Sequence, residues 1–176
     1  MMELIFHIAG ILLIMGSTVW TGATLAAREK YRLRDLGELE RGVLLLEGQI
    51  AYLSAPLPEV LESVGWKMEG AAGEIFRQAA ERMACRDGVS AEEIWADVWK
   101  AGQKETFFRQ EDMDALLLFG KTLGFLDKEQ QKNSIRLFLR YLESAQEQGR
   151  RRLDKNGRLY YGMGVLSGLM LVTVLL

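Results

Sequence analysis

The sequence predicts an all-α fold: a membrane-anchored helical bundle of about six helices between an N-terminal and a C-terminal transmembrane helix. Three observations support this prediction. All 22 Lys and Arg residues lie between Arg28 and Arg158, and the sequence outside these limits is almost entirely apolar. In the charged middle, apolar residues recur at three- and four-residue spacing, which is typical of helices. No segment there shows the alternation that indicates a strand.

The two apolar ends are long enough to cross a bilayer. Residues 4–27 contain 24 uncharged positions, and at about 1.5 Å per residue such a helix exceeds the roughly 30 Å hydrocarbon core. Residues 159–176 contain 18 uncharged positions, about 27 Å of helix by the same rise. We therefore expect a first transmembrane helix in residues 1–27, a helical domain in residues 28–158 and a second transmembrane helix in residues 159–176.

Basic residues concentrate where the apolar ends meet the domain. They are Arg28, Lys30, Arg32 and Arg34 on one side and Arg150, Arg151, Arg152, Lys155 and Arg158 on the other. Because basic flanks stay in the cytoplasm, we expect a cytoplasmic domain whose flanks suit anionic lipid headgroups. Cleavage after Ala26 or Ala27 is an alternative, but the N-terminus lacks the basic region of a signal peptide.

The middle of the chain is acidic. Residues 35–149 carry 13 Lys and Arg against 21 Asp and Glu, a net charge of −8. This balance argues against a nucleic-acid-binding surface. An ordinary solvated surface can carry the same acidic excess. The single cysteine, Cys85, excludes an intramolecular disulfide and fits a reducing compartment.

Apolar stripes predict the first three helices of the domain. The stripes are Leu36, Leu39, Val43, Leu46, Ile50 and Leu53; Leu57, Val60, Leu61, Val64 and Met68; and Ala72, Ile75, Phe76, Ala79 and Met83. Pro56 and Pro58 fit the first turn of the second helix, where a missing N–H costs nothing. The third helix is expected to close near Asp87-Gly88, since glycine tolerates a left-handed cap.

The fourth helix is expected to start at Ser90, which forms a capping-box pattern with Glu93. Trp95 and Trp99 follow one turn apart, as core residues or, alternatively, as exposed anchors for a partner.

Two further stripes predict the fifth and sixth helices: Met113, Leu116, Leu117, Gly120 and Leu123; and Ile135, Phe138, Leu139, Leu142 and Ala145. Gly124 is expected to end the fifth helix, and Asp127 with Gln130 repeats the capping-box pattern before the sixth. The sixth helix either continues into the second transmembrane segment as one rod or bends at Gly149 or Gly157.

The sequence holds few residues suited to catalysis. The only histidine, His7, lies in the first apolar segment, and no Cys, His and carboxylate cluster has metal-ligand spacing. No phosphate-binding glycine loop or nucleophile motif occurs. We expect neither enzyme activity nor a cofactor or metal; the rival class is a membrane-bound enzyme that works with carboxylates and tyrosines.

The apolar ends contain small residues and interfacial aromatics. Gly22, Gly164 and Gly168 allow close helix approach, either between the two spans of one chain or against a partner's membrane helix. Trp20, Tyr160 and Tyr161 lie where aromatics meet the membrane interface.

Four motifs occur in the order and spacing of a known family. They are Trp20-Thr21-Gly22; Leu46-Glu47 with Ile50, Tyr52, Pro56-Leu57 and Glu59; Leu123-Gly124 with Asp127 and Gln131; and Leu159-Tyr160 with Gly164, Leu166, Gly168 and Leu169. On these motifs the chain resembles the stage III sporulation protein AB family of endospore-forming bacteria over nearly its whole length. Agreement is poorest in residues 65–105.

The resemblance implies a place in the channel complex between mother cell and forespore, which is required after engulfment. Members of the family resemble the platform proteins of type II secretion and type IV pilus systems. By this likeness the chain is a non-enzymatic membrane platform on the mother-cell side of the outer forespore membrane. Its implied partners are the cytoplasmic sporulation ATPase and other membrane subunits. The rival is a two-span membrane signalling adaptor unrelated to sporulation.

Glu47, Tyr52, Glu59 and Asp127 are the polar motif residues that we predict at a partner interface. Each also has a local explanation. Asp127 suits an N-cap, Glu59 suits the positive end of its helix, and Tyr52 can cover the end of the core. Glu47 borders an apolar stripe, where a paired carboxylate would add specificity more than stability.

Overall fold

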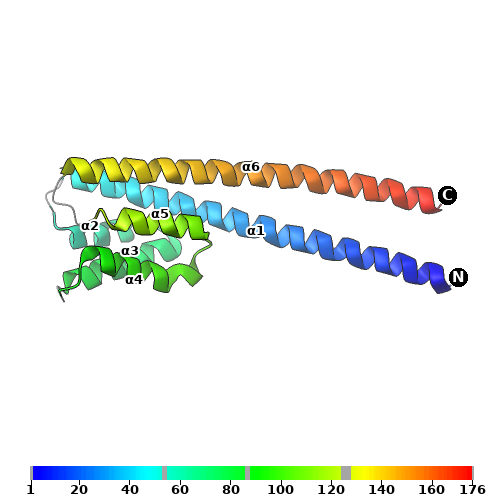
Figure 1. Ribbon diagram of the computed structural model, residues 1–176, viewed down its shortest axis with the longest axis horizontal. Helices are drawn as coiled ribbons and strands as arrows, with labels where there is room; N and C mark the ends of the chain where they lie inside the picture. Colours follow the sequence, from blue (N-terminus) through cyan, green and yellow to red (C-terminus); the bar gives the residue numbers. More distant parts are fainter. Residues whose placement is uncertain (1, 53–54, 86–87, 124–127, 176) are drawn as a thin grey trace. The chain divides into compact units, whose positions relative to one another are not determined.

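The structure, a computed structural model, describes the backbone of residues 2–52, 55–85, 88–123 and 128–175 and the side chains of residues 24–50, 55–85, 88–123 and 129–155. These residues form six α-helices and a short 3₁₀-helix, η1, and contain no strand (Figure 1). The elements are α1 (Met2–Tyr52), α2 (Leu57–Gly65), α3 (Gly70–Ala84), α4 (Ala91–Gly102), η1 (Gln103–Glu105), α5 (Gln110–Gly120) and α6 (Lys128–Leu175). The predicted all-α class is confirmed.

The chain divides into two compact units. One comprises Tyr31–Gln148 and the other comprises Met1–Lys30 with Gly149–Leu176. The first and last helices supply residues to both units. Because α6 runs from Lys128 to Leu175 as one helix, the sixth helix continues into the last uncharged segment without interruption, and Gly149 and Gly157 both lie inside it.

The predicted stripes form one core in the Tyr31–Gln148 unit. Leu36, Leu39, Val43 and Leu46 of α1 are at most 1% exposed, whereas Ile50 is half-buried. The other five helices of this unit also contribute to the core, as do Met68, which follows α2, and Leu123, which follows α5. Every α-helix thus buries one apolar face, which supplies most of its stability.

Helices α2 and α3 approach each other through two glycines. Pro56 is the N-cap of α2, and Pro58 lies in its first turn, as predicted. A Cβ on Gly65 would lie 2.9 Å from the Gly73 carbonyl oxygen, and one on Gly73 would lie 3.0 Å from the Gly65 oxygen. Only glycine at both positions therefore allows this close approach.

The capping box at the start of α4 is confirmed. The Glu93 N–H donates to Ser90 Oγ at 3.2 Å, and the Ser90 N–H donates to Glu93 Oε2 at 3.3 Å. Trp95 and Trp99 are both fully buried, so the core alternative holds for the two tryptophans. Phe76 meets both rings edge-on, and Trp95 Nε1 donates to the Leu116 carbonyl at 3.0 Å.

The end of α5 corrects one prediction. The helix ends at Gly120 instead of continuing to Gly124. The Thr122 and Leu123 N–H groups donate to the Phe119 and Gly120 carbonyls at 3.0 and 3.1 Å, and Thr122 Oγ1 also donates to Phe119 O at 2.7 Å. These tighter bonds satisfy the last carbonyls of the helix. Leu123 is nevertheless buried as expected.

We expect Gly120→Ala to destabilise the protein, because its Cβ would lie 2.1 Å from Cδ1 of the buried Trp95 ring. The predicted loss is about 1–3 kcal/mol, the usual cost of overpacking a core. Gly48→Ala is the matched control, since its Cβ meets nothing within 4 Å and alanine favours a helix by about 0.5–1 kcal/mol. Urea unfolding of the purified full-length chain measures both changes. Equal stabilities for the two variants would contradict the packing of α5 on Trp95.

Candidate functional site

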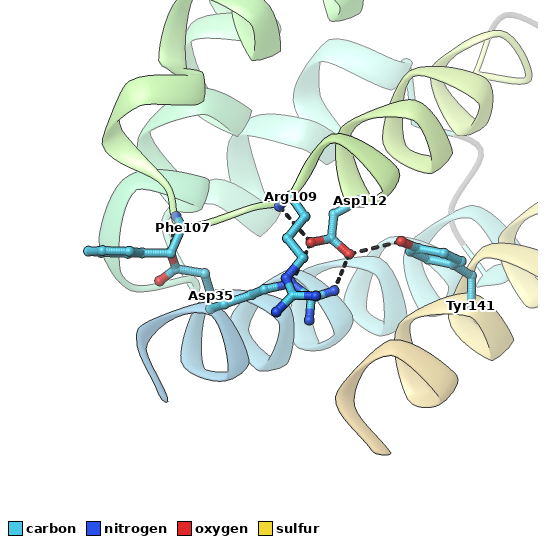
Figure 2. A network of polar contacts seen from close by, with 6 residues as sticks. Asp35, Phe107, Arg109, Asp112 and Tyr141 are labelled. Atoms are coloured by element: carbon cyan, nitrogen blue, oxygen red, sulfur yellow. Dashed lines mark hydrogen bonds and ion pairs between the residues drawn. The ribbon is translucent and has the colours of Figure 1, made fainter. Parts of the chain in front are cut away.

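A buried polar cluster joins α1, α5 and α6. Arg32 and Asp112 are 4% and 2% exposed. Arg32 Nε and Nη2 donate to the two Asp112 carboxylate oxygens at 2.6 and 2.7 Å. The Tyr141 hydroxyl donates to Asp112 Oδ1, and the Arg109 N–H donates to Oδ2, both at 2.8 Å. Figure 2 shows this arrangement, here called the Asp112 cluster.

Local structure positions each member of the cluster. Arg32 lies one helical turn before Leu36, at the start of the buried stripe of α1. Asp112 is the third residue of α5, where a carboxylate both accepts from the N-cap N–H and interacts favourably with the helix dipole. Tyr141 reaches the cluster from α6.

The cluster keeps Asp112 ionised. Burial alone would raise the pKa of Asp112, but hydrogen bonds from Arg32, the Arg109 N–H and Tyr141, together with the charge of Arg32, hold this pKa below its usual value. Burial and the hydrogen bond to the Asp112 carboxylate raise the pKa of Tyr141. Asp112 is therefore a charged acceptor and Tyr141 a neutral donor at neutral pH.

A neighbouring contact fixes the segment before α5 on α1. The Phe107 N–H donates to Asp35 Oδ2 at 2.9 Å, and the Phe107 ring stacks on Tyr31 with 4.9 Å between centroids. Figure 2 shows Asp35 and Phe107 beside the Asp112 cluster.

Because Arg32 and Asp112 are shielded from solvent and bonded to each other, the Asp112 cluster suits a structural cross-link between helices rather than catalysis on a bound substrate.

The sequence interpretation missed the Asp112 cluster. It placed Arg32 in the basic flank of the membrane segment, whereas the structure buries this side chain. The spacing of Arg32 from Leu36 and Leu39 was the available signal, since four and seven residues return to the same helix face. Asp112 gave a similar signal, because it precedes Leu116 by one turn.

The structure places two of the four predicted interface residues. Glu47 is half-buried, and its Oε1 lies 3.5 Å from Nε of Arg136 on α6. Glu59 is exposed in the first turn of α2 and lines a groove beside α3. The side chains of Tyr52 and Asp127 lie outside the described residues.

Two hollows on the Tyr31–Gln148 unit differ in chemistry. The groove beside Glu59 runs between α2 and α3, has a volume of about 590 Å³ and contains four glutamates and one arginine. The other, of about 430 Å³, lies between α5 and α6 and is mainly apolar, with Leu118 and Leu137 exposed at its edge.

The predicted membrane-facing side chains lie outside the part of the chain whose side chains are described: Gly22, Gly164, Gly168, Trp20, Tyr160 and Tyr161. Among the described residues, no helix is sufficiently long and apolar to cross a membrane. Within those same residues, no group of three or more His, Cys, Asp or Glu side chains is placed to hold a metal ion.

These features define a helical protein in which a buried ion pair links the first and fifth helices and a tyrosine hydrogen bond joins the sixth helix to that pair. The chain belongs to the stage III sporulation protein AB family, because the sequence profile of that family matches residues 7–176. The resemblance found in the motifs is thereby confirmed.

The chain is similar to a known protein and to a solved structure of the same family. It is 25% identical over 167 residues to the stage III sporulation protein AB of Bacillus subtilis (strain 168), which covers 95% of this chain and 97% of that protein. A solved structure of stage III sporulation protein AB (SpoIIIAB) has the same fold, with a TM-score of 0.66 and 22% identity. The match covers 70% of this chain and 97% of that one.

We expect Asp112→Asn to destabilise the protein by about 3–5 kcal/mol at neutral pH, because it leaves the Arg32 charge buried without its counter-ion. Asp114→Asn, on the exposed face of the same helix, is the control and should change stability by less than about 0.5 kcal/mol. Urea unfolding of the full-length chain in a neutral detergent measures both.

A comparison of the wild type with Asp112→Asn also tests how the stability depends on pH. The folded pKa of Asp112 lies below the unfolded value of about 3.9. Its stabilisation is therefore fully present above about pH 4 and is lost as the pH falls through the folded pKa. The stability difference between wild type and Asp112→Asn should narrow below about pH 4. A difference that stays constant down to the acid transition would contradict an ionised, paired Asp112.

Proposed function

We propose that this protein is a non-enzymatic membrane platform in the channel complex between mother cell and forespore. Family membership supports a role in sporulation. The observation that supports the platform is the continuity of α1 and α6, of 51 and 48 residues. Each joins residues of the Tyr31–Gln148 unit, without a break in the helix, to an uncharged terminal segment.

In this proposal the uncharged segments, residues 4–27 and 159–176, anchor the protein in the outer forespore membrane. The basic flanks keep the compact unit on the mother-cell cytoplasmic side. Arg150, Arg151 and Arg152 are exposed and suited to anionic headgroups. Small residues such as Gly164 and Gly168 allow packing against other membrane subunits.

The cytoplasmic partner in this proposal is the sporulation ATPase of the same complex. A platform needs a rigid body that presents surfaces to partners. The Asp112 cluster and the aromatic core supply the rigidity, since they fix helices that are distant in sequence. The exposed Glu59 is better placed to meet a partner than Glu47, which already lies beside Arg136.

Deletion of the gene in its host tests the sporulation role. We expect forespores to collapse after engulfment and to lose late forespore-specific reporter expression. The intact chain should restore both, whereas residues 28–158 alone should not, because they lack the anchors. Normal spores after deletion would remove the proposal and favour a two-span signalling adaptor.

The single cysteine tests the sidedness. Cys85 is exposed at the end of α3, so a membrane-impermeant maleimide reports which side of the membrane the compact unit occupies. In intact protoplasts of non-sporulating cells that carry the chain in their plasma membrane, we expect no labelling of Cys85, and we expect full labelling after permeabilisation. A Cys85→Ser chain with Val89→Cys, at another exposed position, is the matched control. Labelling of either cysteine in intact protoplasts would contradict a cytoplasmic unit.

A further inference from the structure

The groove between α2 and α3 contains an exposed aromatic ring. Trp66, which directly follows α2, is 70% exposed, whereas Trp95 and Trp99 are fully buried. A tryptophan that leaves most of its surface in water forgoes a large gain from burial. Exposed tryptophans of this kind are typical anchors of protein interfaces.

The ring is held in place before any partner binds. The Arg77 guanidinium lies 4.5 Å from the centroid of the Trp66 ring. Arg77 Nη1 donates to the Gly65 carbonyl at 2.9 Å, and Nη2 pairs with Glu74. Since Arg77 ties α3 to the end of α2 beside the ring, the Trp66 side chain would lose little conformational entropy when a ligand binds.

The groove has an excess of carboxylates. Glu59, Glu62, Glu74 and Glu81 line it together with a single basic residue, Arg77. All four glutamates are exposed. Arg77 pairs with Glu74, but among the described residues Glu59, Glu62 and Glu81 make no ion pair. Three carboxylates are therefore available to a ligand.

An aromatic ring beside free carboxylates matches the chemistry of arginine. The planar guanidinium stacks on tryptophan and donates paired hydrogen bonds to the two oxygens of a carboxylate. Anionic lipid headgroups and nucleic acids carry the wrong charge for this groove. In the described part of the chain, its glutamates are not grouped closely enough to hold a metal ion, which favours an extended cationic ligand.

We propose that the α2–α3 groove binds an arginine-containing basic segment of a partner protein. The partner's arginine stacks on Trp66 and pairs with the carboxylates of Glu62 and Glu81. The biological meaning of this contact rests on the proposed platform role, whereas the binding itself does not. The chain's own basic run, residues 150–158, is a less suitable occupant because it adjoins the uncharged segment, where anionic headgroups compete for it.

A labelled oligo-arginine peptide tests the proposal against the full-length chain in a neutral detergent. We expect saturable binding by fluorescence anisotropy. Trp66→Ala, and separately Glu62→Gln with Glu81→Gln, should each weaken this binding by about tenfold or more. Glu105→Gln with Glu143→Gln is the charge-matched control, since both residues are exposed and lie outside the groove. The control should bind like the wild type.

Other outcomes would overturn the proposal. If the groove variants and the control variant weaken peptide binding equally, the peptide is attracted to the acidic surface as a whole and not to the groove. The paired Glu→Gln change keeps the test valid if Trp66→Ala fails to fold. A second copy of the chain would be the occupant if the protein self-associates and two kinds of variant lose this self-association. These are the groove variants and the triple variant Arg150→Gln, Arg151→Gln, Arg152→Gln. Normal spores after gene deletion would remove the platform role while leaving peptide binding intact, so the two failures are distinguishable.

Discussion

The buried ion pair between Arg32 and Asp112 constrains the arrangement of the compact unit. The two residues are 80 positions apart, and each would leave a costly uncompensated charge in the interior if the other moved away. Helices α1 and α5 must therefore keep one register. Tyr141 adds α6 to the same constraint. Such a pair adds little net stability over apolar residues of equal size. We interpret its role here as the selection of one arrangement of three helices.

The position of Arg32 also changes the electrostatics of the basic flank that follows the first uncharged segment. This arginine is one of four basic residues that follow the first apolar segment, yet its charge is neutralised by Asp112. Arg34, in contrast, remains exposed. The orientation proposed here thus relies on the exposed cations of both flanks. A charge count along the sequence overstates the positive charge that is available to lipid.

The three tryptophans with described side chains divide between stability and recognition. Trp95 and Trp99 pack with Phe76 in the core and hold α3 and α4 together. Trp66 is instead placed over Arg77 at the surface. Because the interior is fixed by close packing and by the Asp112 cluster, exposed features such as this groove keep a defined shape. The platform role proposed above would need surfaces of this kind.

The sequence by itself determined the helical class, the buried face of each helix, the capping box at Ser90 and the family. The first three depend on the spacing of residues within one or two turns, and the family depends on motifs in a fixed order along the chain, so all four can be recognised without knowledge of the fold. Only the tertiary structure decided that Arg32 is buried against Asp112 and that α5 ends at Gly120. It also decided that Trp66 is exposed while Trp95 is not. These outcomes depend on which helices meet and in what register, and that is set by packing between segments far apart in the chain.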